Sequence, residues 1–239
     1  MNLLKSGIAG AIVALLTAGS ASAASTTSTD FSSGLQGWLG NGAIDSTLGN
    51  SAPAYHTQFE YYGAIWQNST NQAFLCDYTA TSSVTLGIDV LTQSIQFDNS
   101  EVSGDLVVKL VDKGDPAAGT QDAVLWYDLG EISAAKGGWQ HFGVTFGTSG
   151  STLPSGWGAD DGEGDLSLPA GRTFADVLAN IDQIEFTTLK PGGAYDFATF
   201  DVSVDNISLT TSAVPEPASA FAMLLGMGVL AARRRRLAA

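Results

Sequence analysis

Apolar and polar residues alternate with a period of two along several stretches of this chain, and this pattern constrains the fold more than any other feature. Residues 84–90, 106–110 and 142–146 each place β-branched, leucine or aromatic side chains at every second position. Such alternation is typical of half-buried β-strands. Turn clusters rich in Gly, Pro, Asp and Lys separate the stretches, at 112–116, 136–138 and 191–193. With 28 glycines and no alternating helices, the pattern predicts an all-β sandwich.

One short helix is predicted in this β-rich chain, beginning at Phe174. Thr173 is followed three positions later by Asp176, a spacing that resembles a capping box. Phe174, Val177 and Leu178 share one face of that helix, which we therefore expect to bury against the sandwich.

The last predicted strand changes its apolar phase within its length. Its apolar side chains occupy one phase up to Val204 and the other phase from Ile207. A shift of one residue is what a β-bulge produces, and bulges re-aim side chains. We therefore expect a bulge between Asp205 and Asn206, which would turn Asp205 to a new direction, for instance toward a cation.

The first 23 residues have the organisation of a secretory signal peptide. Lys5 supplies a positive start, residues 8–18 form an apolar segment, and Ala21, Ser22 and Ala23 form a small-residue cleavage site. These three parts in this order predict export and removal of residues 1–23.

The last 26 residues, 214–239, contain an apolar run closed by positive charge. The run spans 218–232 and is short beside the roughly 20 residues that a spanning helix needs. A basic flank stays on the cytoplasmic side, so the body of the protein faces outward. Two interpretations remain open, an ordinary single-span anchor and a tail that holds the protein transiently.

This ending resembles the PEP-CTERM sorting tail of Gram-negative bacteria that make exopolysaccharide. The residues that carry the resemblance are Val214, Pro215, Glu216 and Pro217, followed by the apolar helix 218–232 and by Arg233, Arg234, Arg235 and Arg236. It implies a transient stay in the inner membrane, processing by an exosortase, and delivery to the cell envelope or extracellular matrix.

The segment between the two ends, residues 24–213, is predicted to form one domain. The whole chain has 24 acidic and 10 basic residues, of which one acidic and five basic residues lie in the two end segments. The domain therefore has 23 acidic and 5 basic residues, a net charge of −18. Such a charge repels nucleic acid and anionic lipid headgroups, so we expect no nucleic-acid partner. Cys76 is the only cysteine, so no internal disulfide forms, and we expect its thiol to be a small buried apolar group.

A second resemblance covers most of residues 30–210. The opening segment from Asp30 to Trp38, with segments 138–142, 173–186 and 204–209, is similar to laminin B domains and, more loosely, to carbohydrate-binding jelly rolls of the galactose-binding-like class. It implies a jelly-roll β-sandwich with an extracellular structural or ligand-binding role. Related jelly rolls often carry a structural calcium ion, and Asp30 and Asp205 stand at the matching places.

A further calcium candidate is the acidic loop 158–165, in which Asp161, Glu163 and Asp165 alternate with other residues. Calcium takes several carboxylate and carbonyl oxygens on flexible backbone. The loop departs from an EF-hand at Leu166 and Arg172, where Gly and Glu are required. The alternative is a solvated acidic loop that binds no metal. We therefore expect that the protein requires no cofactor, and calcium is the only cofactor that the sequence suggests.

Catalytic motifs are absent from the sequence, and we expect no enzymatic activity. His56 and His141 are the only histidines, so a site of three histidines cannot be built. Neither the zinc-protease motif H-E-x-x-H nor the serine elbow G-x-S-x-G occurs. A hydrolase that uses two carboxylates stays open, since sequence does not show the separation of the pair.

Exposed aromatic rings are the remaining functional candidates, because the CH groups of a sugar ring pack on an aromatic face while polar neighbours bind its hydroxyls. The candidates are Trp157, Trp66, Tyr61 and Tyr62, and Trp157 leads them because it lies among glycines. Packing in the core or at a sheet edge is the alternative for Trp66, Tyr61 and Tyr62. Trp38, Trp126 and Trp139 are expected in the core. The sequence thus predicts either a non-enzymatic exported surface or matrix protein, associated with exopolysaccharide or biofilm, or a carbohydrate-binding module.

Overall fold

The computed structural model describes residues 24–115, 117, 119–193 and 197–213, without the side chains of residues 60, 61 and 213. The predicted signal peptide, 1–23, and the predicted sorting tail, 214–239, lie outside the described residues. Among the described residues, no helix is long and apolar enough to cross a membrane.

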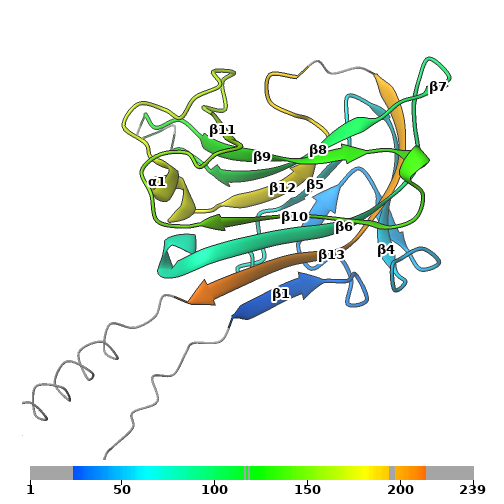
Figure 1. Ribbon diagram of the computed structural model, residues 1–239, viewed down its shortest axis with the longest axis horizontal. Coiled ribbons are helices and arrows are strands. Elements are labelled where there is room, and N and C mark those ends of the chain that lie inside the picture. Colours follow the sequence, from blue (N-terminus) through cyan, green and yellow to red (C-terminus); the bar gives the residue numbers. More distant parts are fainter. Residues whose placement is uncertain (1–23, 116, 118, 194–196, 214–239) are drawn as a thin grey trace, which may run out of the picture. The chain divides into compact units, whose positions relative to one another are not determined.

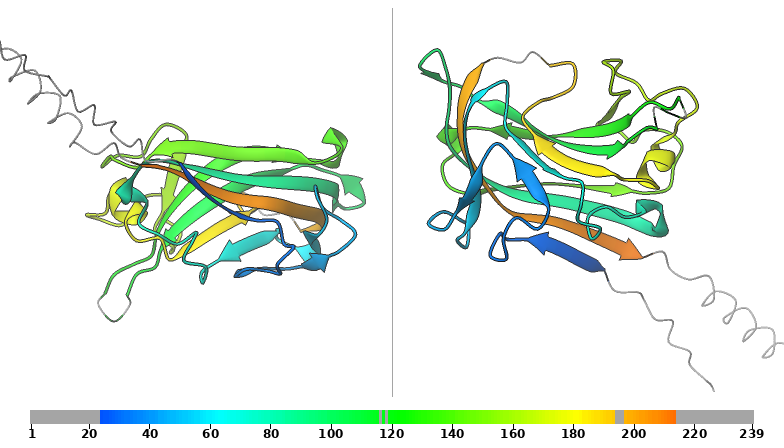
Figure 2. Two further views of the ribbon diagram at one scale, coloured as in Figure 1. Left: turned by 90° about the horizontal axis from the view of Figure 1, so that it is seen from below. Right: turned by 180° about the vertical axis from the view of Figure 1, so that it is seen from behind.

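Two antiparallel sheets form the body, as the alternation predicted, and Figure 1 shows them as two layers. We call them sheet A and sheet B. Sheet A has the order β10-β6-β13-β4-β3, with β1 paired to β13 and β7 paired to β6. Its strands are β1 (Ser25–Thr29), β3 (Ala43–Asp45), β4 (Ala54–Tyr61), β6 (Thr81–Phe97), β7 (Ser100–Glu101), β10 (Gln140–Gly147) and β13 (Ala198–Ala213). Figure 2 shows β1 lying beside β13.

Sheet B lies opposite, in the order β11-β9-β8-β12-β5-β2. Its strands are β2 (Trp38–Gly40), β5 (Ile65–Asn68), β8 (Gly104–Asp112), β9 (Ala123–Ile132), β11 (Trp157–Asp160) and β12 (Gln183–Thr187). Two short 3-10 helices, η1 (Tyr78–Ala80) and η3 (Ala134–Lys136), connect strands. The architecture is the jelly-roll β-sandwich that the sequence predicted.

One α-helix is present among the described residues, α1 (Phe174–Leu178). The predicted capping box is confirmed: Thr173 Oγ1 accepts the N–H of Asp176 at 3.2 Å, and Asp176 Oδ2 accepts the N–H of Thr173 at 2.8 Å. Phe174, Val177 and Leu178 are buried, so the predicted apolar face does pack against the sandwich.

The core between the sheets is rich in aromatic rings. Trp38 packs edge-on against Phe74, with ring centroids 5.4 Å apart. At the other end of sheet B, Trp157 contacts Phe146 at 4.7 Å and Phe174 at 5.6 Å. Edge-to-face contacts of this kind add to the stabilisation from buried area.

The predicted β-bulge in β13 is confirmed. The pairing of β13 with β6 shifts register between Asp205 and Ser208, and Asn206 adopts a positive φ of 49°. Asn tolerates this left-handed conformation better than most residues. The bulge turns Asp205 into a fully buried position, with 0% of its surface exposed.

Candidate functional site

Trp157, the leading aromatic candidate, is a core residue, and the expectation that its ring is exposed is wrong. Only 8% of its surface is exposed. Gly156 makes a turn with a φ of +86°, and the tryptophan that follows starts β11 with its ring directed between the sheets. The glycines therefore shape the turn and do not leave the indole exposed.

Trp66 is also a core residue, with 1% of its surface exposed, as the alternative interpretation of core packing expected. Its Nε1–H donates to the buried Thr57 Oγ1 at 3.0 Å, which satisfies the indole without solvent. The side chain of Tyr61 lies outside the described part of the structure. Tyr62 remains on the surface, 40% exposed and stacked on Phe197 at 4.5 Å.

The bulge directs the Asp205 carboxylate at backbone N–H groups. Its Oδ2 accepts the backbone N–H groups of Asn50 at 2.9 Å and Ser51 at 3.3 Å, and its Oδ1 accepts that of Asn206 at 2.7 Å. N–H dipoles that converge on both oxygens stabilise a carboxylate but repel a cation. Burial raises the pKa of Asp205 above its ordinary value, and the nearby Asp89 carboxylate adds to the rise. Asp205 thus anchors the loop before β4.

The other calcium candidates are engaged locally. Asp30, which is exposed, accepts the N–H and the hydroxyl of Ser32 at 3.0 and 2.6 Å. In the acidic loop, Asp161 Oδ1 accepts the N–H groups of Glu163 and Asp165 at 2.9 and 3.0 Å. These donors, that of Glu163 first, lower the pKa of Asp161. Across the described residues, no group of three or more His, Cys, Asp or Glu side chains is placed to hold a metal ion.

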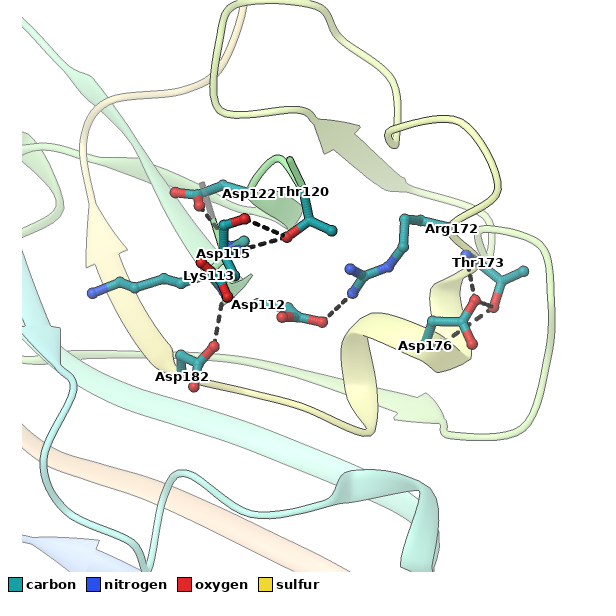
Figure 3. A network of polar contacts seen from close by, with 10 residues as sticks. Asp112, Lys113, Asp115, Thr120, Asp122, Arg172, Thr173, Asp176 and Asp182 are labelled. Atoms are coloured by element: carbon teal, nitrogen blue, oxygen red, sulfur yellow. Dashed lines mark hydrogen bonds and ion pairs between the residues drawn. The ribbon is translucent and has the colours of Figure 1, made fainter. Parts of the chain in front are cut away.

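Acidic residues near α1 form the polar network drawn in Figure 3. The Arg172 guanidinium pairs with the Asp112 carboxylate; burial raises the pKa of Asp112, against the effect of this arginine. The Asp182 carboxylate accepts the N–H of Lys113 at 2.9 Å, and that of Asp122 accepts the N–H of Gly114 at 2.8 Å. The carboxylates of Asp182 and Asp122 thus hold the turn that follows β8.

A line of side chains crosses the outer face of sheet B, and we call it the Trp126 row. Register places its members side by side on five neighbouring pairs of strands: Leu39 with Gln67, Gln67 with Glu185, Glu185 with Lys109, Lys109 with Trp126, and Trp126 with Gly158. Their sequence neighbours Leu125, Leu110 and Phe186 are fully buried in the core. Since successive residues of a strand point to opposite faces, the row lies on the surface.

Trp126 lies flat on the sheet. A Cβ atom on residue 158 would be 2.1 Å from its Cε2 and 2.2 Å from its Cζ2, so the indole covers the backbone of Gly158 closely. Its Nε1–H points to the carbonyl oxygen of Ala159 at 3.4 Å. The ring is half-buried, which leaves a rigid aromatic surface directed away from the protein.

Polar groups continue from the indole along the row. Lys109 Nζ lies 3.3 Å from Glu185 Oε1. From the adjacent position on β12, Gln183 Nε2 donates to Gln67 Oε1 at 2.9 Å and to Glu185 Oε2 at 3.2 Å. These contacts fix the orientation of an ammonium, a carboxylate and two amides beside the aromatic ring. An aromatic face flanked by ordered hydrogen-bonding groups suits a ligand with both apolar CH groups and hydroxyls.

The prediction that Trp126 and Trp139 are core residues is wrong, because both are half-buried. The sequence held a signal for Trp126 that was missed. In β9, Leu125 occupies the inward phase, and Trp126 shares the outward phase with Asp128. Hydrophobicity alone suggested burial, whereas the phase of the strand indicated the surface.

No curated protein matches the sequence. Among solved structures, the chain is similar to the C-terminal family 22 carbohydrate-binding module of Xyn10B from Clostridium thermocellum, with 10% identity, a TM-score of 0.42, and coverage of 80% of this chain and 95% of that one. It is also similar to the family 30 carbohydrate-binding module of a cellulosomal cellulase from the same organism, with 12% identity, a TM-score of 0.36, and coverage of 77% and 93%.

A family model described as the PEP-CTERM protein-sorting motif matches residues 213–236. This match confirms the resemblance of the C-terminal segment. A motif of this kind implies export with a C-terminal membrane anchor and processing by an exosortase. The chain therefore carries a PEP-CTERM sorting motif behind a jelly-roll β-sandwich.

Proposed function

We propose that this protein is a non-enzymatic surface or matrix protein that binds a neutral polysaccharide through the Trp126 row. Exosortase processing of its tail releases it from the inner membrane of a Gram-negative cell into the exopolysaccharide or biofilm. The single observation that carries the binding proposal is the flat, half-buried indole of Trp126 beside the ordered Lys109–Glu185 pair.

Three physical features favour a neutral sugar chain as the ligand. The indole supplies a surface for CH groups, and the neighbouring ions and amides supply donors and acceptors for hydroxyls. The row crosses six strands about 4.8 Å apart, which suits an extended ligand of several rings. The acidic body repels anionic polymers.

The proposal involves no catalysis and requires no cofactor. Among the described residues, each histidine is paired with an aspartate on sheet A, His56 with Asp201 at 2.8 Å and His141 with Asp89 at 2.7 Å. Neither lies on sheet B with the Trp126 row. Binding is therefore expected to persist with a chelator present and to release no reducing ends.

Affinity electrophoresis of the exported protein through gels that contain the producer's own polysaccharide tests the binding proposal. We expect the polysaccharide to retard the wild-type protein, and Trp126→Ala to weaken binding by about 2 kcal/mol, roughly 30-fold. Trp139→Ala is the matched control, because Trp139 is also half-buried but precedes β10 in sheet A. Unretarded wild-type protein, or equal loss in both variants, would contradict the proposal.

Mass spectrometry of the protein released from the cell surface tests the processing proposal. We expect the mature chain to begin near residue 24 and to end near residues 214–217. Recovery of the intact tail, including Arg233–Arg236, in the released protein would overturn exosortase processing and favour a permanent anchor.

A further inference from the structure

A groove is lined in part by residues 102–105, which join β7 to β8. Figure 1 shows β7 at one end of the sandwich. The volume of the groove is about 300 Å³, and both sheets contribute to its walls. Ile95 and Phe200 of sheet A, which are 1% and 5% exposed, lie at its base, and Gly104 and Thr188 lie on the sheet B side. The groove is therefore closed at its base by the core.

Aromatic side chains gather at this groove. Tyr62 and Phe97 line it, with 40% and 42% of their surfaces exposed, and Phe197, 58% exposed, stacks on Tyr62. Among the described residues, these three are the aromatic members of the exposed large hydrophobic side chains. Exposed aromatics concentrated at one concave site indicate a ligand-binding surface.

The groove adjoins the face that carries the Trp126 row. Lys190, which lines the groove, pairs with Asp105 at 3.3 Å and with Asp128 at 2.5 Å. Asp128 follows Trp126 by two residues on β9 and lies on the same face of sheet B. Side chains two apart on a strand are about 7 Å apart, so one sugar chain can contact the indole and reach the rim of the groove.

Charge and size define the ligand. The Lys190 ammonium is balanced by two carboxylates, so the rim carries no excess positive charge to attract an acidic sugar. A volume of about 300 Å³ is at the lower limit of the range for small-molecule pockets. It holds about one pyranose ring, and the base formed by Ile95 and Phe200 prevents a longer chain from passing through.

We infer that this groove binds the neutral terminal sugar of the polysaccharide whose chain lies along the Trp126 row. The inference rests on the proposed function and deepens it: the protein selects chain ends over chain interiors. Tyr62 and Phe97 pack on the ring of the terminal sugar, and Ser103 and Asp105 at the rim receive its hydroxyls.

The test compares intact polysaccharide with the same mass of partially hydrolysed polysaccharide, which has more chain ends, as competitors for the exported protein in solution. We expect the hydrolysed sample to compete better, in proportion to its number of ends. Phe97→Ala is expected to lower the affinity for short fragments about tenfold and to abolish the preference for ends, while retention by intact polysaccharide through the Trp126 row persists. Leu35→Ala removes another exposed apolar side chain and is the matched control.

A second variant, Gly104→Leu, tests the same inference in case Phe97→Ala does not fold. A Cβ on Gly104 would meet Ile95 at 3.6 Å and Thr188 at 4.0 Å, both ordinary contacts, so Gly104→Leu is expected to fold and to fill the groove. It should lose the preference for ends as well. If the wild-type protein binds both samples equally by mass, or if both variants keep the preference for chain ends, the groove does not bind the terminal sugar. The proposed function would still stand. If neither sample binds, the proposed function fails and the inference fails with it.

Discussion

The outer faces of the two sheets use their polar side chains in opposite ways. On sheet A, a row of threonines crosses four strands, and its hydroxyls bond to one another: Thr85 to Thr145 and Thr26 to Thr210, both at 2.8 Å. On sheet B, the corresponding surface carries the Trp126 indole and the Lys109–Glu185 pair. The threonine hydroxyls of sheet A are paired with one another, whereas the sheet B surface combines paired charged groups with an aromatic ring.

This difference indicates where binding energy is available. A hydroxyl that already bonds to its neighbour gains little when a ligand replaces that neighbour. An ammonium has three donors and a carboxylate has several acceptor sites, so Lys109 and Glu185 can bond to each other and still bind ligand hydroxyls. Under the proposed function, recognition therefore lies on the outer face of sheet B, and the threonine pairs of sheet A contribute to stability.

The largest expected effect is on the sheet A side. Asp205→Ala removes a fully buried carboxylate that accepts three backbone N–H groups, and we expect the free energy of unfolding to fall by about 3 kcal/mol. Asp201→Ala, on the same strand but with 26% of its side chain exposed, should cost less than about 1 kcal/mol. Urea denaturation measures both. Similar losses in the two variants would contradict the assignment of Asp205 as the anchor.

The next largest effect is expected on the sheet B side. Glu185→Gln keeps the shape of the side chain but removes its charge, and charge-assisted hydrogen bonds are stronger than neutral ones. We expect polysaccharide affinity to fall by about 1 kcal/mol, roughly fivefold. Calorimetric titration measures this, and unchanged affinity would exclude Glu185 from the site.

The pH dependence of stability provides a smaller effect that is specific to sheet A. Burial raises the pKa of Asp205 in the folded state above its ordinary value of 3.8. The folded protein therefore binds more protons than the unfolded chain just above pH 3.8, and this group's contribution to stability falls as the pH rises through its folded pKa. Asp205→Asn should remove that component from a plot of unfolding free energy against pH. An unchanged slope would contradict the raised pKa.

The smallest effect concerns the threonine row. Thr85→Val and Thr145→Val together remove a surface hydroxyl pair while keeping β-branched side chains in the strands. We expect a change in unfolding free energy of less than about 1 kcal/mol and no change in polysaccharide retention. Loss of retention in this double variant would move recognition to sheet A.

Local features of the fold were predictable because neighbouring residues determine them. The capping box at Thr173 and Asp176 and the bulge after Asp205 both follow from residues a few positions apart. The groups that the Asp205 carboxylate contacts could not be predicted, because the N–H donors of Asn50 and Ser51 lie about 150 residues away in sequence.

The candidate site was less predictable, because strand register assembles it. Gln67, Lys109, Trp126 and Glu185 come from four strands, and only the order of sheet B makes them neighbours. Strand geometry also explains why Trp157, expected on the surface, is buried and why Trp126, expected in the core, is half-buried. Glycines around Trp157 suggested exposure and apolar neighbours of Trp126 suggested burial, but the phase of each strand decided which face each ring occupies.

The five tryptophans offer the most direct test of the claim that sheet B is the binding face. Each indole N–H gives a separate signal in a nitrogen-15 correlation spectrum, and polysaccharide fragments can be added to the labelled exported protein. We expect the Trp126 signal to shift on addition while the signals of the buried Trp38, Trp66 and Trp157 stay in place. A spectrum in which the Trp126 signal stays unchanged while the fragments bind would contradict the claim.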